Sequence, residues 1–204
     1  MRNMKKPLHD GKGCVPMTKK YDRDEILNAG SKTSHASTAS GNQSGAPLYQ
    51  LRSTPKTVPK DRFKKEFGLN DHDQPIRYIQ NDYKKNGDGT VTDRTTGLMW
   101  QQSGSEEPMC CGEVASYLNG LNQSRFAGYS DWRLPTIPEL MSLLDSSKKN
   151  GMLYIDAVFG KQCWCWSSDS RDSNMAWGVD FIFGEVVWVT HNFDFWVRAL
   201  RSGK

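Results

Sequence analysis

The chain has 204 residues and a formal net charge of +4, and 36% of its residues are hydrophobic. No apolar run approaches the roughly 20 residues that cross a membrane, so no membrane span is expected. No apolar stretch follows the basic start, so a secretory signal is not expected either. We therefore expect a cytoplasmic location by default, with the cell surface or secretion as alternatives if the chain is exported by another route.

Charge and apolar residues both divide the chain near residue 70. Residues 1–70 carry 14 Lys+Arg against 6 Asp+Glu, whereas residues 71–204 carry 13 against 17. All seven tryptophans lie between Trp100 and Trp196. The first part has too few apolar side chains to offset the entropy of ordering it. The sequence therefore predicts a disordered or loosely ordered basic leader over residues 1–70 and one folded domain over residues 71–204.

A strongly basic segment, KDRFKK (60–65), lies near the end of this leader. A solvated linker is the favoured interpretation, and contact with nucleic acid or an acidic surface is the alternative. The folded part has no basic face with interleaved aromatic residues, so no nucleic-acid partner is expected there.

The five cysteines are Cys14, Cys110, Cys111, Cys163 and Cys165. Their spacings differ from the C-x₂-C pattern of zinc sites, and the four histidines are scattered, so we expect no metal ion and no cofactor. A disulfide between the pair Cys110–Cys111 and the pair Cys163 and Cys165 is possible in an oxidising compartment. Buried thiols are the favoured state.

The folded part begins with a predicted β-hairpin. One short strand is expected over residues 90–93 and its partner over residues 98–101, with turn residues before and between them. Asn-Gly and Asp-Gly pairs beside such runs are strong hairpin signals. Asn86, Asp88 and Asp93 are also arranged as in a calcium-binding loop, but the glutamate that completes such a loop is absent, and a plain turn is favoured.

A first helix is predicted over residues 111–126. Its apolar residues recur at intervals of three and four, which places them on one helical face. The residues of this face are Val114, Tyr117, Leu118 and Leu121.

A second helix is predicted to begin after Thr136. Thr136 and Glu139 form the S/T-x-x-E pattern of a capping box, in which each side chain bonds the other residue's backbone N–H. Leu140, Leu143 and Leu144 are then expected to face the core.

The remaining pattern is that of β-structure. The segment CWCWSS (163–168) alternates cysteine with tryptophan, so both faces of the strand are apolar, as in a central strand covered on both sides. The cysteines would then be small core residues. Residues 176–189 are expected to form two strands that turn near Gly184, and residues 195–202 a closing strand.

Five segments resemble, in the same order, motifs of the Lcl C-terminal domain family, named for a Legionella collagen-like adhesin. They are NGDGTVTDRTTGLMWQ, FAGYSDWRLPTIPELMSLLD, CWCWSS, AWGVDF and WVRALRS, within residues 77–202. The resemblance implies an α+β, C-type lectin-like fold with two helices and a small twisted antiparallel sheet. It also implies binding without catalysis, including adhesion to sulfated glycosaminoglycans in characterised relatives.

Within these motifs, most of the distinctive residues are expected to be structural. Arg133 is expected to form a fork-like bond to a carboxylate or to backbone carbonyls, with ligand binding as the alternative. The residues given structural roles are Trp100, Asp131, Trp132, Arg133, Trp166, Trp177 and Arg198.

Ligand recognition is expected at loop 169–174, tip 182–185 and loop 190–194. The tip is more apolar than the family pattern, which indicates a recognition surface or side chains folded back on the sheet. Residues 71–204 are acidic overall, which disfavours a sulfated polysaccharide, because such ligands need clustered Lys and Arg. The expected ligand-binding residues are Asp169, Arg171, Asn174, Phe183, Glu185, Trp188, His191, Asn192, Phe193 and Asp194.

The sequence therefore predicts a non-catalytic module that binds a glycan or a protein epitope. One alternative is a display protein of the same fold that is diversified by a retroelement. Another is an oxidase like the formylglycine-generating enzyme, using Cys163 and Cys165. We do not expect an enzyme, because catalytic constellations are not recognisable, and thiol chemistry needs an accessible cysteine of low pKa.

Overall fold

The structure is a computed structural model that describes residues 47–203, and the part of the predicted leader over residues 1–46, with Cys14, lies outside the described residues. The described part is an α+β fold, as predicted from the sequence. Its helices are α1 (Phe63–Phe67), α2 (Cys111–Gln123) and α3 (Ile137–Met141), with a short 3₁₀ helix at Phe126–Gly128. Its strands are β1 (Tyr83–Lys85), β2 (Thr90–Asp93), β3 (Leu98–Gln101), β4 (Trp164–Ser170), β5 (Met175–Asp180), β6 (Glu185–Thr190) and β7 (Leu200–Ser202).

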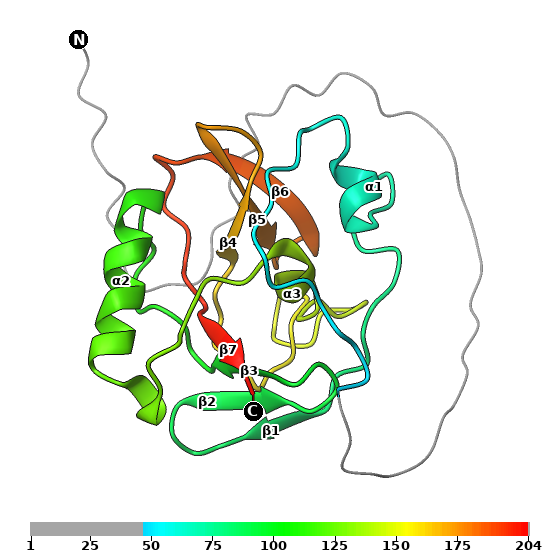
Figure 1. Ribbon diagram of the computed structural model, residues 1–204. Coiled ribbons are helices and arrows are strands. Elements are labelled where there is room, and N and C mark those ends of the chain that lie inside the picture. Colours follow the sequence, from blue (N-terminus) through cyan, green and yellow to red (C-terminus); the bar gives the residue numbers. More distant parts are fainter. Residues whose placement is uncertain (1–46, 204) are drawn as a thin grey trace. The chain divides into compact units, whose positions relative to one another are not determined.

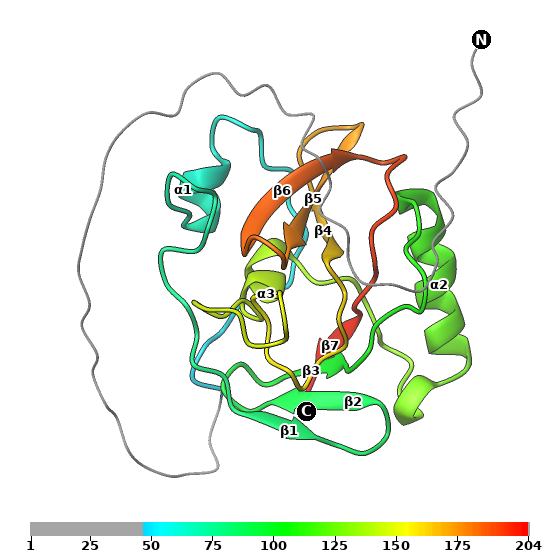
Figure 2. The ribbon, with the colours of Figure 1, turned by 180° about the vertical axis from the view of Figure 1, so that it is seen from behind.

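The strands form two small antiparallel sheets, in the orders β1-β2-β3-β7 and β4-β5-β6. Strands β2 and β3 are the predicted hairpin, with the predicted boundaries. Figures 1 and 2 show α1 on one side of the sheet β4-β5-β6 and α2 on the other. The relation to C-type lectin-like domains stays a prediction.

The predicted closing strand is shorter than expected. Only its last three residues form β7, which pairs with β3. The preceding residues join the other sheet instead: Trp196 N donates to Trp164 O at 2.9 Å, and Trp166 N donates to Trp196 O at 3.0 Å. Strand β4 therefore has a partner on each edge, which confirms that CWCWSS lies in a central strand. The segment 195–202 therefore contacts both sheets, because Trp196 bonds to β4 and β7 pairs with β3.

Helix α3 begins as predicted. Thr136 is its N-cap, and both halves of the capping box with Glu139 are present. The same Glu139 accepts a two-pronged bond from Arg133, at 2.8 Å and 2.6 Å. Because Glu139 is 1% exposed, this pair fixes the loop before α3 to the start of the helix. The predicted core residues Leu140, Leu143 and Leu144 are buried.

The boundary of the predicted leader is different in the structure. Residues 47–70 pack on the domain, and Phe63 stacks on Trp177 with ring centroids 4.7 Å apart. The Trp177 indole N–H donates to Val58 O at 2.9 Å. Phe63 and Phe67 lie four residues apart, so the single turn of α1 presents both rings, and both are buried. The sequence interpretation treated these residues as isolated and missed their common face.

The cysteines do not all remain thiols. Cys163 is disulfide-bonded, whereas Cys110, Cys111 and Cys165 are free. The disulfide considered between the two cysteine pairs is therefore not formed. Cys165 is 0% exposed, and burial raises the pKa of its thiol to about 11. It is a small buried residue, as predicted.

Candidate functional site

The three segments predicted to form one binding surface lie at opposite ends of the sheet β4-β5-β6. The tip 182–185 joins β5 to β6. At the other ends of these strands lie loop 190–194 and residues 171–174 of the predicted loop 169–174, whose first two residues belong to β4. Each strand has six residues, which corresponds to about 17 Å. One surface therefore cannot be formed by all three segments, and the two ends are described separately (Figure 1).

The tip end is closed by neighbouring chain. Gln74 donates to Phe183 O at 2.9 Å, and Val186 N donates to Asp73 O at 2.9 Å. Gly184 has a φ of 68°, and a Cβ there would lie 3.1 Å from the Tyr154 ring. Phe183 is 42% exposed and Glu185 is half-buried. The tip is thus a packed turn with one exposed aromatic edge.

The loop end brings three segments together. His191 N donates to Asn174 O at 3.2 Å, and Cys111 N donates to His191 O at 3.1 Å. The two loops and the start of α2 therefore meet around the His191 backbone. His191 is half-buried, and the exposed residues of the two loops include Asp172, Asn174, Asn192, Phe193 and Asp194.

Trp188 lies on β6 between this end and α1, and its side chain is half-buried. Phe63 and Trp177 contact its ring edge-on, with centroids 5.8 Å and 5.6 Å away. Two cations lie over the ring: Lys60 Nζ is 5.0 Å and Arg171 Cζ 5.4 Å from its centroid. We call Lys60, Arg171 and Trp188 the Trp188 surface. It combines an aromatic ring with positive charge from two distant segments.

Asp169 is not part of this surface, which corrects the sequence prediction. Its side chain is 0% exposed and pairs with both terminal nitrogens of Arg52, each at 2.8 Å. It also accepts from Lys56 N at 2.7 Å and Ile137 N at 2.8 Å. Asp169 therefore joins residues 47–56 to the start of α3. Sequence reasoning missed this role because Arg52 was placed in the leader.

The residues given structural roles all make internal contacts. Arg198 is 0% exposed, and burial lowers the pKa of its guanidinium. It donates to the carbonyls of Gln101, Gln102 and Gly160. Arg201 bonds Asp131 at 2.7 Å, which lowers the pKa of that carboxyl. The indoles of Trp132 and Trp166 donate to Phe126 O and Met109 O, and Trp100 and Trp177 are fully buried.

The acidic residues of the predicted turn are spaced in the sequence as in a metal-binding loop. No group of three or more His, Cys, Asp or Glu residues within residues 47–203 could hold a metal ion. Asp88, predicted to lie in a turn, accepts from Thr90 N at 3.1 Å, and Asp93 is buried and bonded to Thr95 and Thr96. The acidic residues of the hairpin are therefore occupied by the turn itself.

The family comparison agrees with this architecture. The model of the Lcl C-terminal domain matches residues 89–201, more than half of the chain. The chain therefore belongs to the Lcl C-terminal domain family, which indicates an adhesin-like domain. A search of curated proteins found no match. Among residues 47–203, no helix has the length and apolar character needed to span a membrane.

The family match begins after the segment that completes the Trp188 surface. Residues 47–70 carry six Lys+Arg and two Asp+Glu, including Lys60. Sequence reasoning separated these charges from the domain, so it treated the domain as acidic. The signal that could have placed them was the pair Phe63 and Phe67, which gives a basic segment an apolar face.

Proposed function

We propose that the protein is a non-catalytic recognition module that binds an anionic glycan at the Trp188 surface. The observation that carries this proposal is the placement of Lys60 and Arg171 over the half-buried Trp188 ring. A carboxylate or sulfate accepts charge-assisted bonds from Lys and Arg, and the apolar ring contacts the sugar. The ring is held by Phe63 and Trp177, so little freedom is lost on binding.

The charge argument against an anionic ligand changes once residues 47–70 belong to the domain. Residues 47–203 carry 18 Lys+Arg and 19 Asp+Glu, so the described part is nearly neutral. Within residues 47–70, Arg52, Lys56, Arg62 and Lys64 are each paired with a carboxylate, so the positive charge placed over the Trp188 ring comes from Lys60 and Arg171. A local basic surface of this kind attracts an anionic ligand whatever the net charge of the whole domain.

The test is a mixed glycan and glycosaminoglycan array probed with the full chain at physiological salt. We expect binding to sulfated or uronic-acid glycans, weakened by added salt. The double variant Lys60→Ala/Arg171→Ala should lose about tenfold or more in affinity, since hydrogen bonds to charged groups contribute about 1.5–3 kcal/mol each. Both residues lie at the surface, so the variant is expected to fold.

The matched control removes two exposed lysines from β1, Lys84→Ala/Lys85→Ala. It changes the net charge equally and should keep wild-type affinity. Equal losses in both double variants would show nonspecific attraction and reject the Trp188 surface. A folded wild-type chain that binds no glycan also contradicts the proposal, and selective binding of acidic proteins would replace the glycan by a protein epitope.

The alternative functions remain separate predictions. For the oxidase, Cys163 is disulfide-bonded and Cys165 is fully buried with a raised pKa, which disfavours thiolate chemistry at these two residues. For the retroelement-diversified display protein, the loops 171–174 and 190–194 are the exposed segments in which variation would alter binding.

A further inference from the structure

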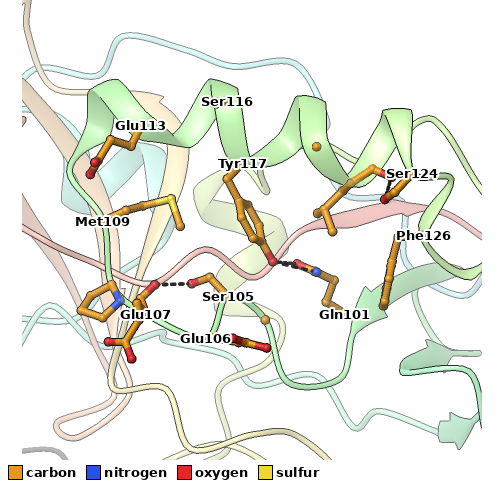
Figure 3. A pocket seen from close by; sticks show the side chains of 14 residues that line it. Gln101, Ser105, Glu106, Glu107, Met109, Glu113, Ser116, Tyr117, Ser124 and Phe126 are labelled. Atoms are coloured by element: carbon orange, nitrogen blue, oxygen red, sulfur yellow. Dashed lines mark hydrogen bonds between the residues drawn. The ribbon is translucent and has the colours of Figure 1, made fainter. Parts of the chain in front are cut away.

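A second candidate site lies between α2 and the segment before it. A groove of about 810 Å³ is bounded by the helix and by residues 101–109. This volume lies within the range of small-molecule and peptide pockets. Figure 3 shows the side chains of Met109 and Tyr117 between the two walls. The groove shares no residue with the Trp188 surface, so the inference is independent of the proposed function.

The groove exists because α2 is incompletely buried. Of the four residues predicted on its apolar face, only Val114 is buried, whereas Tyr117, Leu118 and Leu121 are half-buried. Tyr117 and Leu121 line the groove with Met109 and Phe126. A helix normally buries such a face against a core or a partner. Here the floor of the groove is apolar and reaches solvent.

The charged residues that line the groove all have the same sign. They are Glu106, Glu107 and Glu113, and no Lys, Arg or His is among the lining residues. Glu106 and Glu107 are exposed, and within residues 47–203 neither takes part in an ion pair. Figure 3 shows Glu107 and Glu113 toward one end of the groove and Phe126 at the other. The acidic end complements a cation, and the other end complements apolar groups.

The length of the groove indicates the size of its ligand. The lining residues of α2 and its C-cap extend from Glu113 to Ser124, which is about 16 Å along the helix axis. An extended peptide of about five residues has this length. Along the walls, the Ser105 hydroxyl already donates to Glu107 O at 2.9 Å and the Ser124 hydroxyl to Leu121 O at 3.1 Å. The exposed Ser116 offers a hydroxyl to the backbone of such a peptide.

We propose that the groove between α2 and residues 101–109 binds a short extended segment of a partner protein that carries Lys or Arg at one end and apolar side chains at the other. The cation lies beside the exposed carboxylates of Glu106 and Glu107, whereas the Glu113 carboxylate accepts from Cys110 N in the cap of α2. The apolar side chains pack on Tyr117 and Leu121 and extend toward Phe126. Charge selects the partner, and the apolar floor supplies affinity.

The chain offers a direct way to block the groove. Gly120 is an exposed helical residue that lines it, and a Cβ at this position meets no other atom within 4 Å. Gly120→Trp fills the groove from the helix side without a clash in the core. Asn119→Trp places the same side chain one residue away, at an exposed position outside the lining. Comparing these two variants separates the effect of filling the groove from the effect of adding a tryptophan to the surface.

The test selects a phage-displayed library of short random peptides on the full chain. We expect recovered peptides to be enriched in Lys and Arg beside Leu, Ile or Phe. Their affinity should fall about tenfold or more in Gly120→Trp and in Glu106→Lys/Glu107→Lys, because each variant removes a central part of the contact. Asn119→Trp should bind as the wild type does.

Three results would overturn the inference. One is a selection that yields no peptide, or peptides without excess Lys and Arg. Another is equal affinity for the wild type and Gly120→Trp when thermal denaturation shows both to be folded. The third is self-association of the chain that Gly120→Trp abolishes, because the occupant would then be a second copy.

Discussion

The two ends of the sheet β4-β5-β6 are built from similar residues and differ in what covers them. The tip end carries Phe183 and Glu185, and the loop end carries Trp188, His191 and Phe193. The tip is bonded to residues 73–74 and packed on Tyr154. The loop end keeps exposed polar side chains and two cations over an aromatic ring.

This difference shows why an exposed aromatic residue is weak evidence for a binding site. Phe183 is 42% exposed, yet its backbone and the following glycine are fixed by packing. Trp188 is half-buried, yet Lys60 and Arg171 lie over its ring. Exposed area alone therefore does not distinguish an aromatic residue of a packed turn from a ring that lies beneath two cations.

The largest expected effect comes from removing the support of the Trp188 surface. Phe63→Ala deletes a buried ring that stacks on Trp177 and contacts Trp188. We expect a loss of about 3–5 kcal/mol in the free energy of unfolding, typical of Phe→Ala in a core. Urea denaturation measures it. A loss below about 1 kcal/mol would show that residues 47–70 contribute little to the domain.

An intermediate effect is expected at the tip end. Gly184→Val forces a β-branched residue into a φ of 68° and places its Cβ 3.1 Å from the Tyr154 ring. Such strain costs about 1–3 kcal/mol, and thermal denaturation should show a lower Tm. Ligand binding at the loop end should remain unchanged, because the strands separate the two ends. A lost affinity with an unchanged Tm would reverse the roles assigned to the ends.

The smallest effect is expected at the loop end itself. Asn192 is exposed, so Asn192→Ala should change the free energy of unfolding by less than about 0.5 kcal/mol. The same urea titration provides the measurement, with Gly184→Val as the comparison. A loss of about 1 kcal/mol or more is typical of mutations that disturb packing. Such a loss would show that the loop is packed against the domain.

The parts of the fold that were predictable depend on neighbours in sequence. The hairpin of β2 and β3 follows from its turn residues, and the start of α3 follows from Thr136 and Glu139, three positions apart. The central position of CWCWSS follows from its two apolar faces. Each of these signals lies within one short segment, so the sequence contains it directly.

The parts that were not predictable depend on distant partners. Arg52 and Asp169 are 117 positions apart, and no local pattern joins them. The same holds for Phe63 and Trp177, whose contact moves the domain boundary toward the N-terminus. The candidate site was predicted in part: Arg171 and Trp188 were named, whereas Lys60 was assigned to the leader.

Residues 47–70 precede the family match and supply part of the Trp188 surface. Residues 89–201 carry the family framework, whereas Lys60 belongs to a segment that precedes it. That segment is attached mainly through Phe63, Phe67 and the Arg52–Asp169 pair. A homologous chain that keeps these anchors and exchanges the residues between them retains the scaffold and acquires a new charge pattern beside Trp188. Under the proposed function, part of the binding surface is therefore supplied by a segment that the family match does not cover, and the match alone does not define the ligand.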